Sequence, residues 1–270
     1  MFALHYILKF NKSPIVGLLC YIIKMEKKNN SIRIMQKCAK IGDRIFSKVC
    51  IELKKHTLKT EIELANFIKS EIKKTGAVEA FPVIVTSGKR AGNDIHPIPT
   101  NSKLSGFVII DFGIKYAGYC SDMTRTIYVV SPNSKGKTNK PTKLEISLYN
   151  TVLNAQNGSI KYFKSGFPVS SSDAYVRGFL ANKIVRQGLT TKTLDKYFIH
   201  TLGHGIGKKV HEKPKIFYKS HEVFKAGQMV TSEPGIYIPN KLGIRIEDMY
   251  LITDDKPKQI TKSSRELLVF

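Results

Sequence analysis

The chain has 270 residues, of which 42% are hydrophobic and 24% charged, so it is long enough to bury a large core and has an ordinary globular composition. Its formal net charge of +23 would suit nucleic acid or another anionic partner. The lysines are spread along the whole chain, however, and no nucleic-acid recognition motif accompanies them. Composition and charge therefore predict no specific nucleic-acid partner.

The first 24 residues are expected to form a poorly defined extension ahead of one domain at residues 25–270. They contain an apolar run at 15–23, which is too short for a transmembrane span of about 20 residues. No small-residue cleavage site follows the run, so a secretory signal is not indicated. A weak membrane anchor is the alternative interpretation. The four cysteines form no C-x-x-C pair, which predicts reduced thiols in a cytoplasmic protein.

The first half of the domain is predicted to begin with two helices. Apolar residues fall near helical spacing over residues 25–50. The second helix begins at the capping-box pattern Thr60-x-x-Glu63 and ends at Gly76. Three strand-like runs follow, at residues 81–86, 106–113 and 122–130.

The same order of elements recurs in the second half. A polar stretch at residues 131–142 is predicted to be the connecting loop. Thr142-x-x-Glu145 then begins a helix that continues through Leu153, and another helix is expected over residues 172–188. Strand-like segments come last, around His200, at 229–233 and at 243–252. Two successive helix-helix-strand units predict an α+β fold built from a duplicated unit, although no sequence repeat is visible.

Two aspartates in the first half suggest a cation site. Asp111 ends an apolar run and Asp122 follows eleven residues later, with a turn expected between them. If the hairpin is symmetric about Tyr116 and Ala117, the two aspartates face one another across the strands. Like charges in that position destabilise a strand pair unless a cation lies between them. The alternative is a register shift that turns one aspartate toward solvent.

The second half contributes an imidazole and two further carboxylates. The glycine-rich segment around His204 disfavours a helix, and in an extended segment His200 and His204 share one face. Glu233 ends a strand at a Pro-Gly turn. Glu247 lies on the same face as Arg245, and the alternative for this glutamate is a plain ion pair with that arginine.

These motifs resemble those of the pita-bread metallopeptidases, most closely the Xaa-Pro aminopeptidase and prolidase branch. The resemblance covers about residues 25–270. The motifs that carry it are Asp111-Phe112-Gly113, Ser121-Asp122-Met123-Thr124-Arg125-Thr126, the segment from His200 to His211, Glu233-Pro234-Gly235-Ile236-Tyr237, and Arg245-Ile246-Glu247-Asp248. The resemblance implies a pita-bread fold with two pseudo-symmetric halves and a metal-dependent exopeptidase that removes an N-terminal residue preceding proline.

By this resemblance, two divalent ions are expected per chain, and the five ligands fill the family's metal positions. The ligands would be Asp111, Asp122, His204, Glu233 and Glu247. Oxygen-rich ligation with one imidazole favours Mn²⁺ or Co²⁺, with Zn²⁺ and Fe²⁺ as alternatives. A pair of such ions activates water and stabilises the oxyanion of the tetrahedral intermediate.

The resemblance also assigns catalytic roles. Glu233 would move the proton of the attacking water, and His96, His200 and His211 would contact the substrate and the developing oxyanion. Tyr237 and Arg245 match residues that orient the ligands. The partner is then a peptide substrate, and because many relatives are dimers the resemblance allows a homodimer.

The chain departs from this branch in length, because Xaa-Pro aminopeptidases and prolidases carry a large N-terminal domain ahead of the catalytic one. At most about 24 residues precede the domain here. A methionine aminopeptidase, which shares the short architecture and the Gly-His-Gly-Ile-Gly segment, is therefore an alternative. A second alternative is a catalytically silent binding module of the same fold.

Overall fold

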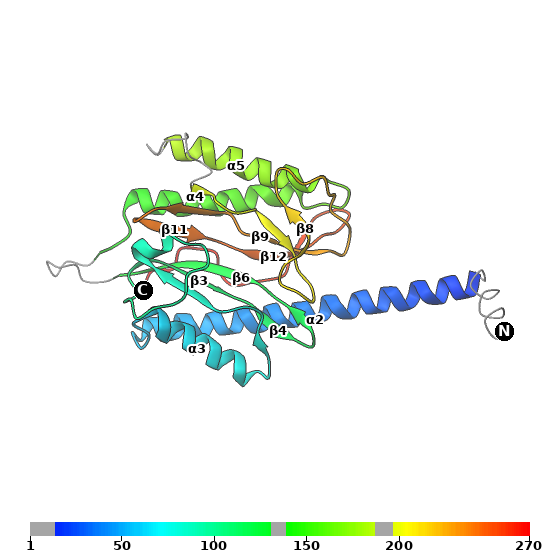
Figure 1. Cartoon of the computed structure of the whole chain (residues 1–270), viewed down its shortest axis with the longest axis horizontal. Helices are drawn as coiled ribbons and strands as arrows, with labels where there is room; N and C mark the ends of the chain where they lie inside the picture. Colours follow the sequence, from blue (N-terminus) through cyan, green and yellow to red (C-terminus); the bar gives the residue numbers. More distant parts are fainter. Residues whose placement is uncertain (1–13, 131–138, 187–196) are drawn as a thin grey trace.

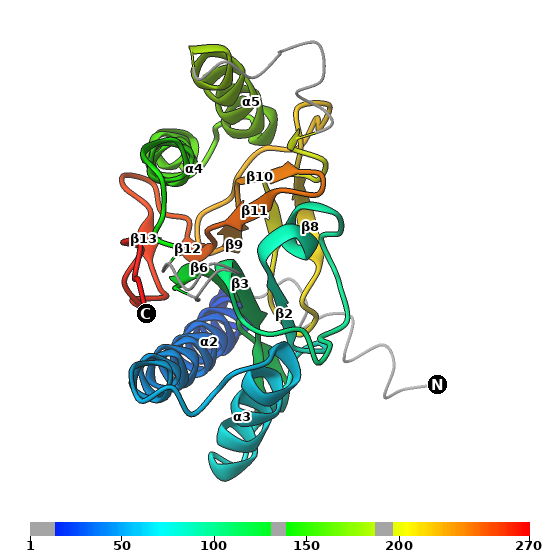
Figure 2. The ribbon, with the colours of Figure 1, turned by 90° about the vertical axis from the view of Figure 1, so that its left-hand side faces the viewer.

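The computed structural model describes residues 14–130, 139–186 and 197–270. Two helix layers enclose the strands, as Figure 1 shows. Helices α2 (Pro14–Lys54) and α3 (Glu61–Lys74) cover one side, and α4 (Lys143–Ser159) and α5 (Val169–Arg186) cover the other. Figure 2 shows the same layers from the end of the molecule, with the strands between the two helix pairs.

The strands of the first half lie against α2 and α3. The larger sheet is antiparallel, with the order β2 (Ile84–Ser87), β3 (Gly106–Phe112) and β6 (Met123–Val129). A smaller sheet joins β1 (Val78–Glu79), β4 (Ile114–Tyr116) and β5 (Tyr119–Cys120), and the short 3-10 helix η1 (Gly88–Gly92) follows β2. Apolar side chains from both helices and from β2, β3, β4 and β6 form one buried cluster. The side of α2 and α3 that faces this cluster is thereby removed from water.

The second half has its own sheets and core. Five strands are ordered β13 (Lys258–Gln259), β12 (Asp248–Leu251), β9 (Met229–Ser232), β7 (Gly203–Gly205) and β8 (Glu212–Ile216). Strands β10 (Gly235–Ile238) and β11 (Leu242–Arg245) form a separate antiparallel pair. A second buried cluster packs these strands against α4 and α5. The short 3-10 helix η2 (Ile160–Tyr162) lies between these two helices in the chain.

Both predicted capping boxes are present. The Thr60 hydroxyl accepts a hydrogen bond from the Glu63 amide at 3.2 Å, and the Glu63 carboxylate accepts one from the Thr60 amide at 3.1 Å. Thr142 and Glu145 make the same reciprocal pair at the start of α4. Each box satisfies backbone N–H groups that the first turn of a helix leaves without partners. The equivalent start of one helix in each half agrees with the predicted duplication.

The predicted register of the aspartate hairpin is wrong by two residues. Asp111 pairs with Thr124, not with Asp122. The turn is centred on Ala117 and Gly118, whose φ angles of 48° and 80° suit a tight hairpin turn, one step beyond the predicted centre. Because side chains alternate with period two, a two-residue shift keeps both aspartates on the same face of the sheet. The shared face was therefore predicted correctly, although the direct opposition was not.

The predicted strand at residues 243–252 is two strands. Strand β11 pairs with β10 and strand β12 pairs with β9, so the chain leaves one sheet for another between them. Ile246 and Glu247 occupy this crossing point, where the Glu247 amide donates to the Thr124 carbonyl at 3.1 Å. The crossing joins the second half of the molecule to β6 of the first. Residues 131–138 of the predicted loop and 187–188 of the predicted helix lie outside the described residues.

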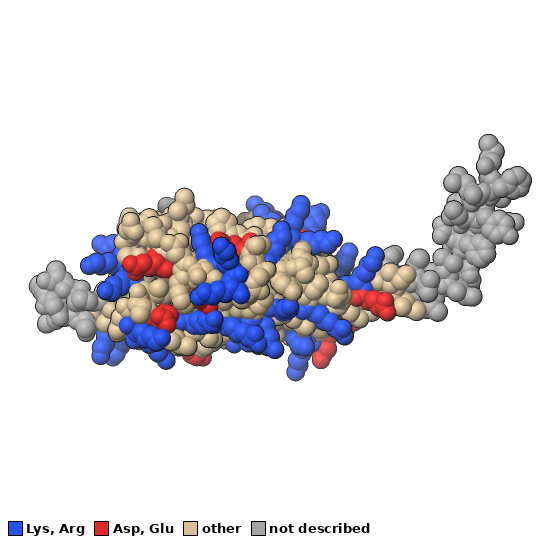
Figure 3. All heavy atoms as spheres, turned by 90° about the horizontal axis from the view of Figure 1, so that it is seen from below, with Lys and Arg blue, Asp and Glu red and all other residues tan. Residues whose placement is uncertain are grey.

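Helix α2 passes through the predicted boundary at residue 25 without a break, and that boundary stays a prediction. Within the described chain, none of the helices has the length and hydrophobicity to cross a bilayer. Cys38, Cys50 and Cys120 are free thiols, as expected. Figure 3 shows that basic side chains are dispersed over the α2–α3 side of the molecule rather than gathered in one patch.

Candidate metal centre

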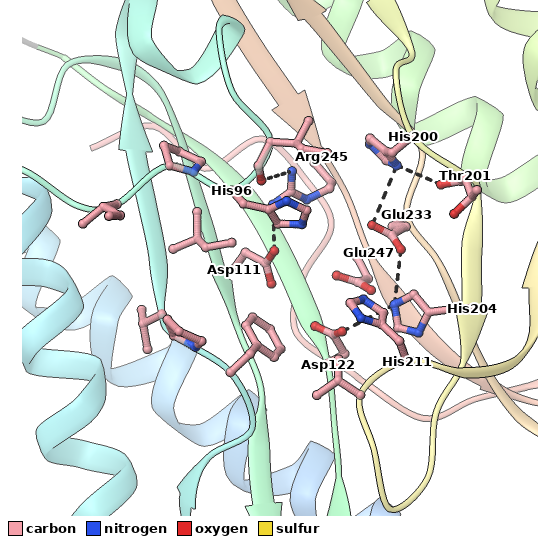
Figure 4. A pocket seen from close by; sticks show the side chains of 18 of the residues that line it. His96, Asp111, Asp122, His200, Thr201, His204, His211, Glu233, Arg245 and Glu247 are labelled. Carbon is pink, nitrogen blue, oxygen red and sulfur yellow. Dashed lines mark hydrogen bonds and ion pairs between the residues drawn. The ribbon is translucent and has the colours of Figure 1, made fainter.

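A cavity of about 890 Å³ lies between the two halves, and all five predicted ligands line it. Its walls also include His96, His200 and His211, so every side chain assigned to the site from the sequence meets here. Figure 4 shows these residues converging on one space from strands of both halves. The apolar part of the wall comes mainly from one stretch of the first half, namely Phe81, Pro82, Val83, Ile95, Pro97, Ile98 and Pro99.

The first half contributes two buried carboxylates. Asp111 lies near the end of β3 and is 7% exposed, and Asp122 comes directly before β6 and is 4% exposed. Both strands are apolar on the side that packs against α2 and α3, which fixes the aspartate face toward the cavity. Burial of two carboxylates in one cavity is costly unless cations compensate them.

The imidazole of His204 is held at the centre of a close-packed strand. A Cβ atom at Gly203 would lie 2.2 Å from the Thr231 carbonyl oxygen, and one at Gly205 would lie 2.1 Å from that of Lys213. Glycines on both sides of His204 therefore allow β7 to fit between β9 and β8. The His204 Nδ1 atom lies 3.1 Å from the Gly205 carbonyl oxygen. Because a carbonyl only accepts, Nδ1 carries the proton and Nε2 presents a lone pair to the cavity.

The two glutamates complete the cluster. Glu233 Oε1 lies 3.4 Å from His204 Nε2, and Asp122 Oδ2 lies 3.7 Å from the same nitrogen. Asp122, His204 and Glu247 each offer a ligand atom within 4.8 Å of the others. This grouping joins a residue that precedes β6, one on β7 and one between β11 and β12. It is a ligand set that only the folded chain brings together.

Three carboxylate oxygens in the cavity point to a bound cation. Asp111 Oδ1, Asp122 Oδ1 and Glu247 Oε1 are buried and have no hydrogen-bond partner among the described residues. Burial and the neighbouring Glu247 and Asp111 charges raise the pKa of Asp122 well above its usual range. Burial and the Asp111 charge raise the pKa of Glu247 to about 8. Mutual repulsion of this kind is relieved by divalent cations, so the residues fit a metal site.

A hydrogen-bonded chain connects Asp111 with His200. The Arg245 guanidinium donates to Asp111 Oδ2 at 2.7 Å and to the Tyr237 hydroxyl at 2.8 Å. The Tyr237 hydroxyl lies 2.9 Å from His200 Nε2, and His200 Nδ1 lies 2.8 Å from the Thr201 carbonyl. Burial and Arg245 lower the pKa of His200 to about 3. His200 is therefore neutral and accepts from Tyr237, and Arg245 pairs with Asp111 rather than with Glu247.

Residues that the sequence reasoning did not assign hold Glu247 in place. The Thr124 hydroxyl donates to Glu247 Oε2 at 2.7 Å. Arg125 donates to the Glu247 carbonyl at 2.6 Å and pairs with the buried Asp248 at 2.6 Å. Thr124 follows Asp122 by two residues, so period-two spacing placed it on the site face. That spacing could have indicated Thr124 from the sequence, but its hydrogen bond to Glu247 in the other half could not be predicted.

His96 and His211 lie at the solvent-facing part of the cavity. Both residues are exposed, whereas His204 is buried. The rings of His204 and His211 meet edge to face, with their centroids 4.3 Å apart. Figure 4 places His96 beside Arg245 on the opposite side of the site from His200. The substrate contacts expected of these two histidines stay a prediction.

Two similar halves with a carboxylate-rich, cation-ready cavity between them define a metallopeptidase of the pita-bread fold. The chain belongs to metallopeptidase family M24, whose family model matches residues 33–254. Members of this family use divalent metal ions.

The similar curated proteins include two archaeal dipeptidases. The chain is 35% identical over 249 residues to the Xaa-Pro dipeptidase of Pyrococcus furiosus, covering 91% of this chain and 66% of that protein. It is 36% identical over 250 residues to the Xaa-Pro dipeptidase of Pyrococcus horikoshii, covering 92% of this chain and 64% of that protein. The chain thus spans slightly less than two thirds of the length of these relatives.

Solved structures give the same result. The Xaa-Pro dipeptidase from Bacillus anthracis superposes with a TM-score of 0.76 and 34% identity, covering 89% of this chain and 63% of that one. The X-Pro aminopeptidase from Thermotoga maritima superposes with a TM-score of 0.75 and 28% identity, covering 90% of this chain and 64% of that one. The pita-bread fold predicted from the motifs is therefore confirmed.

Proposed function

We propose that this protein is a metal-dependent exopeptidase that removes an N-terminal residue preceding proline, as an Xaa-Pro aminopeptidase or dipeptidase. The observation that carries the proposal is the buried ligand cluster, in which Asp111, Asp122 and Glu247 each present an oxygen without a partner among the described residues. Relatives that cover most of this chain are named for Xaa-Pro dipeptide cleavage, which supports the choice of substrate.

The chain would hold two divalent ions, with Mn²⁺ or Co²⁺ favoured by the oxygen-rich ligand set. The ligands would be Asp111, Asp122, His204, Glu233 and Glu247. When bound, the ions supply an activated water and electrostatic stabilisation of the oxyanion. Zn²⁺ and Fe²⁺ are the alternatives that metal analysis would distinguish.

The remaining groups bind substrate and move protons. Glu233 is 17% exposed at its side chain, so it alone of the acidic ligands reaches partly toward the substrate space, where it would take a proton from the attacking water. His96 and His211 lie at the open side and would contact the substrate and the developing oxyanion. Both ring nitrogens of His200 are engaged, with Tyr237 and with the Thr201 carbonyl, so this imidazole would contact the substrate through its ring.

Proline suits the cavity for two reasons. An Xaa-Pro bond has no N–H, so a cleft that depends on that donor binds it poorly, whereas attack from a carboxylate-lined cavity does not need it. The cavity wall formed by Phe81, Pro97, Ile98 and their neighbours supplies apolar surface for a rigid ring. We also propose a cytoplasmic location and a homodimer, which fractionation and light scattering would check.

The test is a comparison of three peptide classes with metal-loaded protein. Xaa-Pro and Xaa-Pro-Xaa peptides should be cleaved, and Met-Ala-Ser should be cleaved more slowly. Faster cleavage of Met-Ala-Ser would instead indicate a methionine aminopeptidase. Absence of cleavage of all three, with metal bound, would indicate a binding module and contradict the proposal.

A further inference from the structure

Three lysines line the metal cavity but take no part in the proposed chemistry. Lys213 and Lys215 come from β8 in the second half, and Lys69 comes from α3 in the first. All three residues are exposed, whereas four of the five expected metal ligands are buried. The lysines therefore lie at the solvent side of the cavity, and we refer to these three residues as the lysine rim.

Strand pairing places one of these lysines beside the expected metal ligand His204. Strands β7 and β8 are antiparallel, and Lys215 lies directly opposite His204. Opposed residues of an antiparallel pair project from the same face, with their Cβ atoms about 5 Å apart. Figure 4 shows His204 turned into the site, so Lys215 extends from the same face of the sheet. Lys213 is exposed as well, whereas Pro214 between the two lysines is buried.

The lysine rim has no carboxylate partner within the described part of the chain. Glu212, the acidic residue of β8, instead accepts a hydrogen bond from the Lys209 amide at 2.9 Å. Residues 208–219 include five lysines and this one acidic residue. The positive charge of the rim is therefore open to a ligand of opposite charge, which would gain electrostatic complementarity.

The interior of the cavity does not cancel this charge once metal is bound. The four carboxylate ligands carry at most four negative charges, which two divalent ions would balance, and Arg245 adds a further positive charge. The net charge of +23 extends the same sign over the whole molecule. A cleft lined by one sign of charge concentrates ligands of the opposite sign and speeds their association. The basic composition, which no nucleic-acid motif accompanies, thus has a physical consequence at this cavity.

We propose that the lysine rim selects acidic peptides by pairing with Asp or Glu side chains in the part of a substrate that emerges from the cavity. The inference rests on the proposed function and adds a substrate class to it, namely Xaa-Pro peptides with acidic side chains at the fourth and fifth residues. In an extended peptide these residues lie roughly 8 to 12 Å beyond the first peptide bond. A lysine side chain that begins about 5 Å from His204 reaches this zone.

The kinetic test compares two peptides that differ in charge and hardly in shape. Ala-Pro-Ala-Asp-Asp and Ala-Pro-Ala-Asn-Asn share the same scissile bond and the same terminal groups. In about 0.1 M salt, metal-loaded protein should have a KM about fivefold lower for the Asp peptide, the size expected for two solvent-exposed ion pairs. In about 1 M salt the difference should shrink to within about twofold, because the Debye length falls from about 10 Å to about 3 Å. Equal KM values at the lower salt concentration would overturn the proposal.

Charge-removing variants with a matched control locate the effect. The rim variant combines Lys69→Gln, Lys213→Gln and Lys215→Gln, and it should bring the two KM values to within about 1.5-fold of one another. The control removes the same net charge at three exposed lysines that do not line the cavity, by combining Lys40→Gln, Lys54→Gln and Lys161→Gln. The control should keep the fivefold ratio. A fivefold ratio in the rim variant with a parental melting temperature, or an equal loss in the control, would contradict the proposal.

Binding can also be measured without cleavage. Pro-Ala-Asp-Asp-Trp has no residue ahead of its proline, so the proposed activity does not cut it. The chain contains no tryptophan, so the fluorescence anisotropy of the peptide reports its binding without a protein background. The parent should bind this peptide about fivefold more tightly than Pro-Ala-Asn-Asn-Trp, and the rim variant should bind the two equally. That preference without cleavage of any Xaa-Pro peptide would support the lysine rim and overturn the peptidase function. Cleavage of both Ala-Pro peptides with no preference in KM or in binding would keep the function and overturn the rim.

Discussion

The Arg245 guanidinium lies 2.7 Å from Asp111 Oδ2, while Asp111 Oδ1 has no partner among the described residues. One oxygen of this carboxylate is therefore fixed by the protein, and the other is left for a cation. Arg245 also donates to Tyr237 and, at 3.2 Å, to the Thr124 hydroxyl, which in turn donates to Glu247. The Arg245 side chain thus orients Asp111 of the first half directly and Glu247 of the second half through Thr124.

The first prediction concerns this arginine. Arg245→Lys keeps the positive charge but loses the fork that reaches several acceptors at once. Metal affinity or kcat/KM should fall by about 10- to 100-fold, as is usual when a partner that orients metal ligands is lost. Metal titration and steady-state kinetics would measure the change. The control is Arg44→Lys, which changes an exposed arginine on α2. Equal metal affinity and kcat/KM in the two variants would contradict the orienting role of Arg245.

The second prediction concerns metal content. Asp122 contributes to the grouping with His204 and Glu247 and has a further unpartnered oxygen, so its removal affects every ion that the cluster holds. Parent protein should bind two divalent ions per chain, and Asp122→Ala should lose both together with nearly all activity. Elemental analysis after gel filtration would give the count, with circular dichroism as the check of folding. Full metal content in the variant would refute the shared-ligand role.

The third prediction separates the histidines. His204 Nε2 faces two carboxylates of the cluster, so His204→Ala should lower metal content. His96 and His211 lie at the exposed side of the cavity, so their alanine variants should keep metal and lose on the order of 10² to 10³ in kcat. Metal analysis alongside kcat distinguishes the two classes. Loss of metal from folded His211→Ala would show that the assignment of His204 and His211 is reversed.

Features that depend on neighbouring residues were predicted well from the sequence, whereas the pairing of distant strands was predicted less well. Both capping boxes are present, and the four carboxylates and one imidazole expected as metal ligands line one cavity, because each stands in a short motif of characteristic residue types. The hairpin register was wrong because Ala117 takes a positive φ of 48°, a conformation that alanine does not signal. The change of sheet at Ile246 and Glu247 was also missed, because an apolar run does not reveal which partner strand each part chooses.

The fourth prediction concerns the ion pair beneath His200. Arg177→Ala would leave the buried Asp173 without its cation and should destabilise the protein by about 3–5 kcal/mol. Arg177→Lys keeps the charge but cannot bond the carbonyls of Phe198 and His200 together. The lysine variant should therefore keep most of the stability and show a raised KM for Xaa-Pro peptides. Thermal melts and kinetics would separate the two effects, and a lysine variant with parental KM would limit the pair to a structural role.

The last prediction is substrate choice. The cavity walls offer apolar surface from Phe81 to Pro99, and the catalytic groups do not require an N–H on the scissile bond. Xaa-Pro-Xaa tripeptides should therefore be cleaved with a kcat/KM at least about tenfold above that for Met-Ala-Ser, which corresponds to about 1.4 kcal/mol in transition-state binding. Peptides longer than dipeptides should be accepted because a pocket of about 420 Å³, which shares His200, Thr201 and Lys215 with the metal cavity, continues the space past His200. Replacing proline by N-methylalanine, which also lacks the N–H but has no ring, is the control for the donor argument. Cleavage of that peptide at a rate between those of the proline and alanine peptides would assign part of the preference to the missing donor and the rest to the ring. Preference for Met-Ala-Ser over every proline peptide would reject the proline-directed assignment.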